Sequence, residues 1–176
     1  MNEAVNSLSF AFDDDHGLPV DEDRRAFRIA LGRYPTGVAV VTALDMAGQA
    51  VGITINSFAS VSLDPPLVLW SIEEHSAFAP AFIEADAYAI SVLAADQSAV
   101  AQAFAGPGEH RFRDCETQET RLGIPVPKGA LAVFECRRFA LYPGGDHRIL
   151  LGRVERVTTC AGEPLVFHEG ALRGLG

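Results

Sequence analysis

The clearest hydrophobic pattern in the chain is a strand-like alternation between residues 52 and 66, which read GITINSFASVSLDPP. Its apolar side chains are Ile53, Ile55, Phe58, Val61 and Leu63. The polar places hold short, uncharged residues instead of the charges of a water-facing strand: Thr54, Asn56, Ser57, Ser60 and Ser62. Short side chains let a flat ligand approach the backbone while hydroxyl and amide groups reach its polar edge. The alternative interpretation is a Ser/Thr-rich edge strand and turn without a ligand.

Short apolar runs separated by turn residues continue through the rest of the chain. Helical spacing predicts a helix from Asp21 to Tyr34 that ends at Pro35, and two more with Ser76 and Asp96 as their N-caps. Residues 105–129 are rich in loop signals. Strands are expected at 38–43, 51 onward, 67–72, 88–93, 131–142, 147–160 and 165–168. Because these strands are mostly adjacent in sequence, we expect a mainly β fold, a closed antiparallel barrel with helices packed outside.

Charge and length set the domain organisation. The chain has 176 residues and a formal net charge of −9. Residues 1–20 and the three acids that follow hold seven acidic residues and no Lys or Arg. We therefore expect a disordered acidic arm at 1–20 and a single domain at 21–176. No basic cluster supports nucleic-acid binding, and no apolar run is long enough to span a membrane. Without a signal peptide pattern, the expected location is cytoplasmic.

No catalytic motif based on protein side chains alone is present. The three cysteines form no C-x-x-C pair, and the five histidines have no metal-ligand spacing, so no metal site is predicted. There is no G-x-S-x-G elbow, P-loop or G-x-G-x-x-G motif after a strand. If the chain is an enzyme, its reactive atoms therefore belong to a cofactor.

Three further features have both a structural and a functional interpretation. Ser76 either caps a helix or marks an anion site. Residues 144–148 (GGDHR) either form a glycine hairpin turn or display His147 and Arg148 at a barrel mouth. Phe104 and Phe112, on either side of a Gly-Pro-Gly loop, are either core anchors or a lid over a flat ligand.

Taken together, three stretches resemble the short-chain flavin reductases, the reductase partners of two-component flavin-dependent monooxygenases. They are residues 27–43 (FRIALGRYPTGVAVVTA), 52–67 (GITINSFASVSLDPPL) and 144–154 (GGDHRILLGRV), and the resemblance covers residues 24–172. It implies a flavin-binding split β-barrel, a homodimer with the flavin near its interface, oxidation of NADH or NADPH, and reduction of FMN or FAD. It also implies release of the reduced flavin to a partner flavin-dependent monooxygenase.

The resemblance also implies roles for individual residues. Those expected to line the isoalloxazine ring and ribityl chain are Thr54, Ile55, Asn56, Ser57, Phe58, Ser60 and Val61. Those expected on the phosphate side are Ser71, Ile72 and Glu73, with Ser76 at the phosphate itself. Ala105 and Gly106 would come from a covering loop, and Asp146, His147 and Arg148 would meet the nicotinamide nucleotide, with His147 in the catalytic site. Two positions depart from the family pattern: His75 replaces a common Lys or Arg, and Leu172 replaces a common aromatic residue.

The residues favour neither FMN nor FAD, and neither NADH nor NADPH. Two alternatives to a flavin reductase stay open, namely a flavin-binding module without turnover and a reductase of another acceptor such as a corrinoid or ferric complex. The Gly-Asp-His turn favours an enzyme, because a protein that only binds flavin has no need of a second nucleotide site.

Overall fold

The computed structural model describes residues 24–106, 112–113 and 115–175. The chain divides into two units, Met1–Tyr34 and Pro35–Gly176. In the first unit, α1 (Arg24–Gly32) continues into a turn in which the N–H of Tyr34 donates to the carbonyl of Leu31 (3.2 Å). The predicted end of this helix before Pro35 is confirmed, since proline cannot donate the next hydrogen bond. The predicted arm at 1–20 and the acidic first turn lie outside the described residues.

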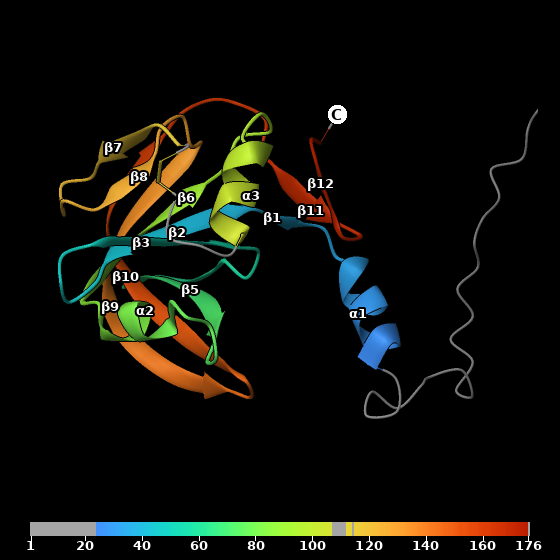
Figure 1. Cartoon of the computed structure of the whole chain (residues 1–176), viewed down its shortest axis with the longest axis horizontal. Helices are drawn as coiled ribbons and strands as arrows, with labels where there is room; N and C mark the ends of the chain where they lie inside the picture. The colour runs from blue at the N-terminus through green and yellow to red at the C-terminus, as the bar shows by residue number, and fades with distance from the viewer. Residues whose placement is uncertain (1–23, 107–111, 114, 176) are drawn as a thin grey trace, which may run out of the picture. The chain divides into compact units, whose positions relative to one another are not determined.

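The second unit is built on a seven-stranded sheet in which every neighbouring pair is antiparallel (Figure 1). In spatial order its strands are β3 (Ala50–Ile55), β2 (Ala39–Leu44), β6 (Ala87–Val92), β9 (Ala132–Gly144), β10 (His147–Thr159), β5 (Pro66–Glu73) and β4 (Ala59–Leu63). The predicted antiparallel, mainly β fold is confirmed.

The expectation of a closed barrel was wrong, and the split form implied by the resemblance is what the structure shows. Although β3 and β4 follow one another in sequence, they stand at opposite ends of the hydrogen-bonded order. Residues 56–58 connect these two strands in place of a tight hairpin turn. The sheet is therefore open at a seam between these two strands.

Shorter elements complete this unit, and several of them were not predicted. Two small sheets and two helices make up the set: β1 (Thr36–Gly37), β11 (Val166–His168) and β12 (Ala171–Arg173); β7 (Thr117–Glu119) and β8 (Pro125–Pro127); α2 (Ala79–Glu84) and α3 (Ser98–Ala105). The strands β7 and β8 occupy the region that was expected to be loop. Across the described ranges, no helix has the length and apolarity needed to cross a membrane.

Both predicted N-caps of these helices were wrong. The N-cap of α2 is Phe78 and that of α3 is Gln97, and neither makes a side-chain capping hydrogen bond. The Ser76 hydroxyl instead accepts the backbone N–H of Phe78 (3.3 Å) within the preceding turn. Pro80 supplies a preset φ in the first turn of α2, which favours that start over one at Ser76.

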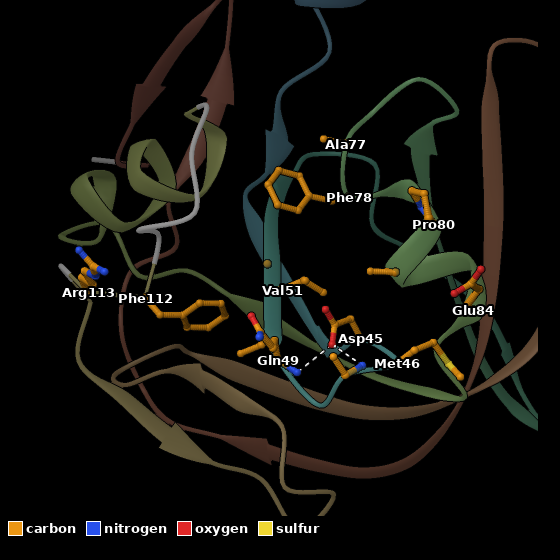
Figure 2. Close-up of a pocket in the computed structure, with 14 residues that line it drawn as sticks. Asp45, Met46, Gln49, Val51, Ala77, Phe78, Pro80, Glu84, Phe112 and Arg113 are labelled. Carbon is orange, nitrogen blue, oxygen red and sulfur yellow. Dashed lines mark hydrogen bonds between the residues drawn. The ribbon is translucent and has the colours of Figure 1, made fainter.

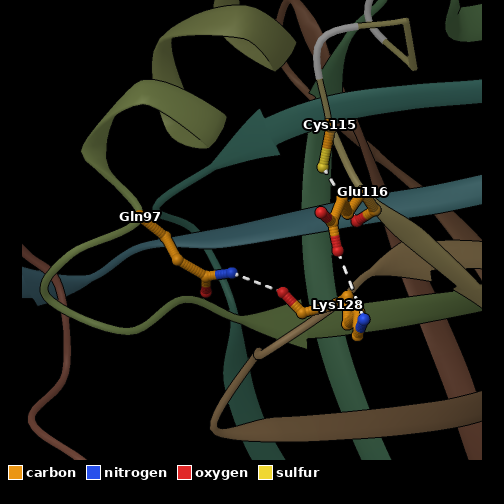
Figure 3. A network of polar contacts seen from close by, with 4 residues as sticks. All are labelled: Gln97, Cys115, Glu116 and Lys128. Carbon is orange, nitrogen blue, oxygen red and sulfur yellow. Dashed lines mark hydrogen bonds and ion pairs between the residues drawn. The ribbon is translucent and has the colours of Figure 1, made fainter.

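A polar network ties the β7–β8 hairpin to the start of α3 (Figure 3). The Gln97 side chain accepts the N–H of Ala94 (2.9 Å) and donates to the carbonyl of Lys128 (2.9 Å). The Lys128 ammonium in turn pairs with the Glu116 carboxylate (3.2 Å). The amide oxygen and nitrogen of Gln97 therefore bind backbone groups outside α3, which explains why this side chain does not cap the helix.

The strand β2 is apolar except at the buried Thr42, because it separates two cores. Its buried residues alternate: Ala39, Val41 and Ala43 pack in the main barrel core with Trp70 and Tyr88, whereas Val40 packs under α3. Period-2 alternation sends successive side chains to opposite faces, so a strand with two buried faces reads as a continuous apolar run.

The hairpin of β9 and β10 is the longest element, with 13 residues in each strand, and contains two register shifts. Leu151 pairs with Ala140 but Gly152 pairs with Arg138, so one β9 residue, Phe139, is unpaired. Farther along, Val154 pairs with Cys136 and Arg156 with Glu135, so the β10 residue Glu155 is unpaired in this ladder. Bulges of this kind bend a strand and increase its twist.

Candidate functional site

The Thr54 hydroxyl, expected at the ligand, makes its hydrogen bond to a neighbouring helix. It donates to the carbonyl of Ala101 in α3 (2.7 Å). Gly52, on the same face of β3, leaves room for the helix, since an added Cβ there would lie 2.5 Å from Cε1 of Phe104. The alternate residues, Ile53 and Ile55, face the main core. The alternation noted in the sequence therefore seats α3 on β3.

The Ser57 hydroxyl has a similar role on the opposite side of the seam. It accepts the backbone N–H of Ser71 (3.0 Å) and donates to the carbonyl of the same residue (3.3 Å). Strand β5 is paired with β4 only as far as Leu69, so Ser57 continues that edge with its side chain. The segment after β3 is thereby fixed to β5.

A cavity of about 280 Å³ opens beside the end of β3, and it unites four of the predicted site residues. These are Thr54, Ile55, Asn56 and Ala105. Five further lining residues were not among the predicted ligands: Val38, Ala101, Gln102, Phe167 and Leu172. Of these five residues, the sequence analysis had singled out only Leu172, which replaces a common aromatic residue of the family. The signal that could have revealed Phe167 is its place opposite Leu172 in the β11–β12 pair.

The lining of this smaller cavity fits a flat ring with a polar edge. Apolar side chains form most of it, and the Asn56 and Gln102 amides provide donors and acceptors at its rim. Its volume lies just below the ~300 Å³ at which cavities for whole small molecules begin. The residues present therefore fit the ring system of a flavin, with the remainder of the ligand extending outside this cavity.

The second predicted site, at the β9–β10 turn, is built by strand register. His147 pairs with Glu73 across the β10–β5 ladder, and the N–H of Glu74 donates to the carbonyl of Asp146 (2.9 Å). The Asp146 carboxylate contacts Nδ1 of His147 at 2.6 Å, and the Arg148 guanidinium pairs with the Glu74 carboxylate. Because a carboxylate accepts, Nδ1 carries the proton and Nε2 is turned away from Asp146.

The predicted phosphate-side and β4 residues do not all present side chains to a ligand. The side chain of Ile72 is buried in the main core, and Phe58 packs on Phe134 with ring centroids 5.2 Å apart. Ser60 and Val61 are exposed on β4, at the far end of the strand order from Thr54. Within this chain, Ser60 and Val61 therefore do not line the cavity beside β3.

A larger cavity, of about 610 Å³, lies between β3, α2 and residues 112–113 (Figure 2). Its walls include the rings of Phe78 and Phe112 and the side chains of Gln49 and Arg113. No sequence pattern predicted this cavity, apart from the interpretation of Phe112 as part of a lid. Phe104 is fully buried and meets Phe112 edge-on (5.0 Å, 88°), so it is a core anchor.

Among the described residues, no three His, Cys, Asp or Glu side chains gather as ligands for a metal ion. Burial raises the pKa of the Cys136 thiol to about 12, with smaller contributions from Glu155 and Glu135. A thiol with so high a pKa is a poor nucleophile. Neither finding provides an alternative to a bound cofactor as the reactive group.

A model of the flavin reductase-like domain family matches residues 31–176. The chain belongs to this family. The resemblance seen in the sequence is thereby confirmed, as are the split-barrel fold and NAD(P)H-dependent flavin reduction as the reaction class.

The relatives of this flavin reductase have names that agree with the match. An NADH-dependent FMN reductase of Agrobacterium fabrum is 49% identical over 154 residues, covering 88% of this chain and 87% of the relative. The reductase component of a Thermus thermophilus 4-hydroxyphenylacetate 3-monooxygenase is 40% identical, with 86% and 97% covered. The flavin reductase spans only about half of some longer matches, 46% and 52% in two cases.

A solved structure gives the same result for the fold. The NADH:FAD oxidoreductase of Streptomyces globisporus, in complex with NAD and FAD fragments, matches the flavin reductase with a TM-score of 0.84 and 37% identity. The match covers 89% of this chain and 95% of that one.

Proposed function

We propose that this chain is an NAD(P)H:flavin oxidoreductase that reduces FMN or FAD and supplies the reduced flavin to a partner monooxygenase. The relatives support this proposal, since one is named as an FMN reductase using NADH and another as a monooxygenase reductase component. When bound, the flavin supplies the hydride-accepting ring, so the protein needs only to hold two ligands in contact.

The observation that carries this proposal is the connection between the two predicted sites. Ser57, from the strand-like motif, is bonded to Ser71 on β5. Two residues farther along the same strand, Glu73 pairs with His147 of the Gly-Asp-His turn. Segments about 90 residues apart in sequence are therefore fixed to one strand, as a site for an electron carrier and its donor requires.

The proposed roles follow from these positions. Asn56 lies at the rim of the smaller cavity and meets the edge of the flavin ring, while Ala105 and Gly106 cover it from the end of α3. Ser71, Glu73 and Ser76 line the path of the ribityl chain toward its phosphate. His147 contacts the nicotinamide nucleotide through Nε2, with Asp146 fixing the orientation of its ring.

The test is a steady-state assay of NADH and NADPH oxidation with and without FMN or FAD. We expect oxidation to depend on added flavin. His147→Ala should raise the KM for the nicotinamide nucleotide more than the KM for flavin, whereas Arg137→Ala, which removes an exposed pair on the same hairpin, should change neither. Folded protein whose NADH oxidation is not stimulated by either flavin contradicts the proposal.

Two further measurements separate the alternatives. A flavin-binding module would keep its yellow colour through purification and fail to bleach when NADH is added without oxygen. A reductase of another acceptor would turn over a corrinoid or a ferric complex faster than free flavin. A cytoplasmic location stays a prediction, which cell fractionation tests.

A homodimer also belongs to this proposal. The apolar side chains of Val61 and Leu63 are 48% and 94% exposed on the edge strand β4. Exposed apolar side chains on an edge strand are typical of an interaction surface. A second copy that covers this strand would bring Ser60 and Val61, which lie away from the smaller cavity in one chain, toward a flavin site.

A further inference from the structure

We propose that the larger cavity binds the adenosine monophosphate half of a dinucleotide, which is FAD or NAD(P)H. This inference rests on the proposed function and extends it, since the residues expected to hold flavin do not include this cavity. The feature that carries it is a cavity of about 610 Å³ with two aromatic rings and one guanidinium group in its lining.

The position of the cavity relative to the proposed flavin site is the first argument. On the α2 side, the first lining residues are Ala77 and Phe78, which directly follow Ser76, the residue proposed to hold the flavin phosphate. On the strand side it includes Val51 and Gly52, which precede Thr54 by about 7–10 Å along β3. FMN ends at its phosphate, whereas FAD continues beyond it with an adenylate group that would enter this cavity.

The side chains lining the cavity are the second argument. Figure 2 shows the rings of Phe78 and Phe112 reaching toward β3 from different sides. Flat aromatic faces stack on purine bases, and a guanidinium such as that of Arg113 is suited to phosphate. Gln49 offers an amide donor and acceptor for the polar edge of a base.

The charge of the lining argues against a nucleic acid or a lipid as the occupant. Glu84 and Arg113 lie on opposite sides of the cavity in Figure 2, so its lining is neither uniformly basic nor apolar. Asp45 uses Oδ1 to accept the N–H groups of Ala47 (2.9 Å) and Gln49 (2.8 Å), which holds the β2–β3 turn rigid. A long nucleic acid would require several cations here, and a lipid would require an apolar lining.

Two variants test the inference without removing a core contact. Ala50 is exposed on β3 and lines the cavity, so Ala50→Trp fills the space with a side chain that strands tolerate well. Arg113→Ala removes the exposed guanidinium. Val157→Trp is the matched control, because it places the same ring at an exposed β10 position that lines neither this cavity nor the smaller one.

The measurements are Kd values for FAD and FMN, and KM values for NADH and reduced nicotinamide mononucleotide. In the unmodified protein we expect at least one dinucleotide, FAD or NADH, to have a Kd or KM about fivefold or more below that of its mononucleotide. This is the ratio that ~1 kcal/mol of base stacking gives. Ala50→Trp and Arg113→Ala should reduce that ratio toward one and leave the FMN Kd unchanged within about twofold, while Val157→Trp preserves it. Whether the flavin or the nicotinamide ratio falls identifies the source of the adenylate group.

The inference is overturned if the unmodified protein binds FAD no better than FMN and uses NADH no better than reduced nicotinamide mononucleotide. It is also overturned if Ala50→Trp and Arg113→Ala both keep the ratios of the unmodified protein. With FMN binding and turnover intact, that result leaves the proposed function standing. Failure of the unmodified, folded protein to bind either flavin overturns the proposed function and this inference together.

Discussion

Replacing Ser57 by alanine should weaken both the fold and flavin binding, because one hydroxyl serves two backbone groups. It accepts the Ser71 N–H at 3.0 Å, a good hydrogen bond, and donates to the Ser71 carbonyl at 3.3 Å, which is longer than the usual range for a hydroxyl donor. Strand β4 has no residue paired with Ser71, so Ser57→Ala leaves a half-buried N–H without its partner.

The magnitude follows from the geometry. An unsatisfied donor costs about 1–3 kcal/mol when buried, and partial exposure of Ser71 places the expected loss of unfolding free energy at about 1–2 kcal/mol. For a chain of this size that lowers Tm by about 2–8 °C. Because the hydroxyl also holds the segment that carries Asn56, the flavin Kd should rise.

Urea unfolding measures the change in stability, and flavin fluorescence measures Kd. Ser57→Thr keeps a hydroxyl and should recover most of the stability. Ser62→Ala removes a serine hydroxyl from the neighbouring strand β4 and should stay within about 0.5 kcal/mol of the unmodified protein. A Ser57→Ala protein as stable as Ser62→Ala would refute the reasoning.

Three further outcomes are expected. Unfolding free energy should fall as pH rises from about 9 toward 12, with about 1.4 kcal/mol per pH unit coming from Cys136, because the unfolded state releases the Cys136 proton near pH 9.0 while the folded state keeps it to about 12. Burial also raises the pKa of Tyr88, which adds to the slope above about pH 10. Cys136→Ala should therefore lower the slope in pH-dependent urea titrations by about 1.4 kcal/mol per pH unit, and an unchanged slope would contradict the assignment. Gly152→Ala should cost about 1–3 kcal/mol or more, because its Cβ would collide with the Tyr88 hydroxyl and lie 2.8 Å from Tyr88 Cζ. The cost should be smaller in a Tyr88→Phe background, which removes the hydroxyl and keeps Cζ, and equal costs in a double-mutant cycle would rule out the clash with the hydroxyl. Leu63→Asp should convert a dimer to a monomer in light scattering, and an unchanged dimer mass would move the interface away from β4.

The sequence was sufficient for the larger elements because their patterns depend on local chemistry. The end of α1 before Pro35 and the glycine turn before His147 each follow from backbone restrictions of one or two residues. The β-branched run at 38–43 indicated a strand, and the structure shows in addition that both faces of β2 are covered.

The partners of the polar side chains could not be predicted in the same way. Alternation shows which face of β3 the Thr54 side chain occupies, but its acceptor is 47 residues away in sequence. The two strands of the β7–β8 hairpin have three residues each, too few for a periodic signal, and Lys128 ties them to Gln97 across 31 residues. The larger cavity likewise draws on three segments that are far apart in the sequence, and only Gly52 and Phe112 in its lining belong to features noted in the sequence.

The two bulges in the β9–β10 hairpin shift the strand register in opposite directions, so their effects cancel. The pair Leu151–Ala140 and the pair Arg156–Glu135 have the same register, while the pairs between them are displaced by one residue. Phe139 on one strand and Glu155 on the other are the skipped residues. Deleting either one would leave a net offset of one residue along the hairpin, which exchanges its faces, whereas deleting both would return His147 to phase with the base of the sheet.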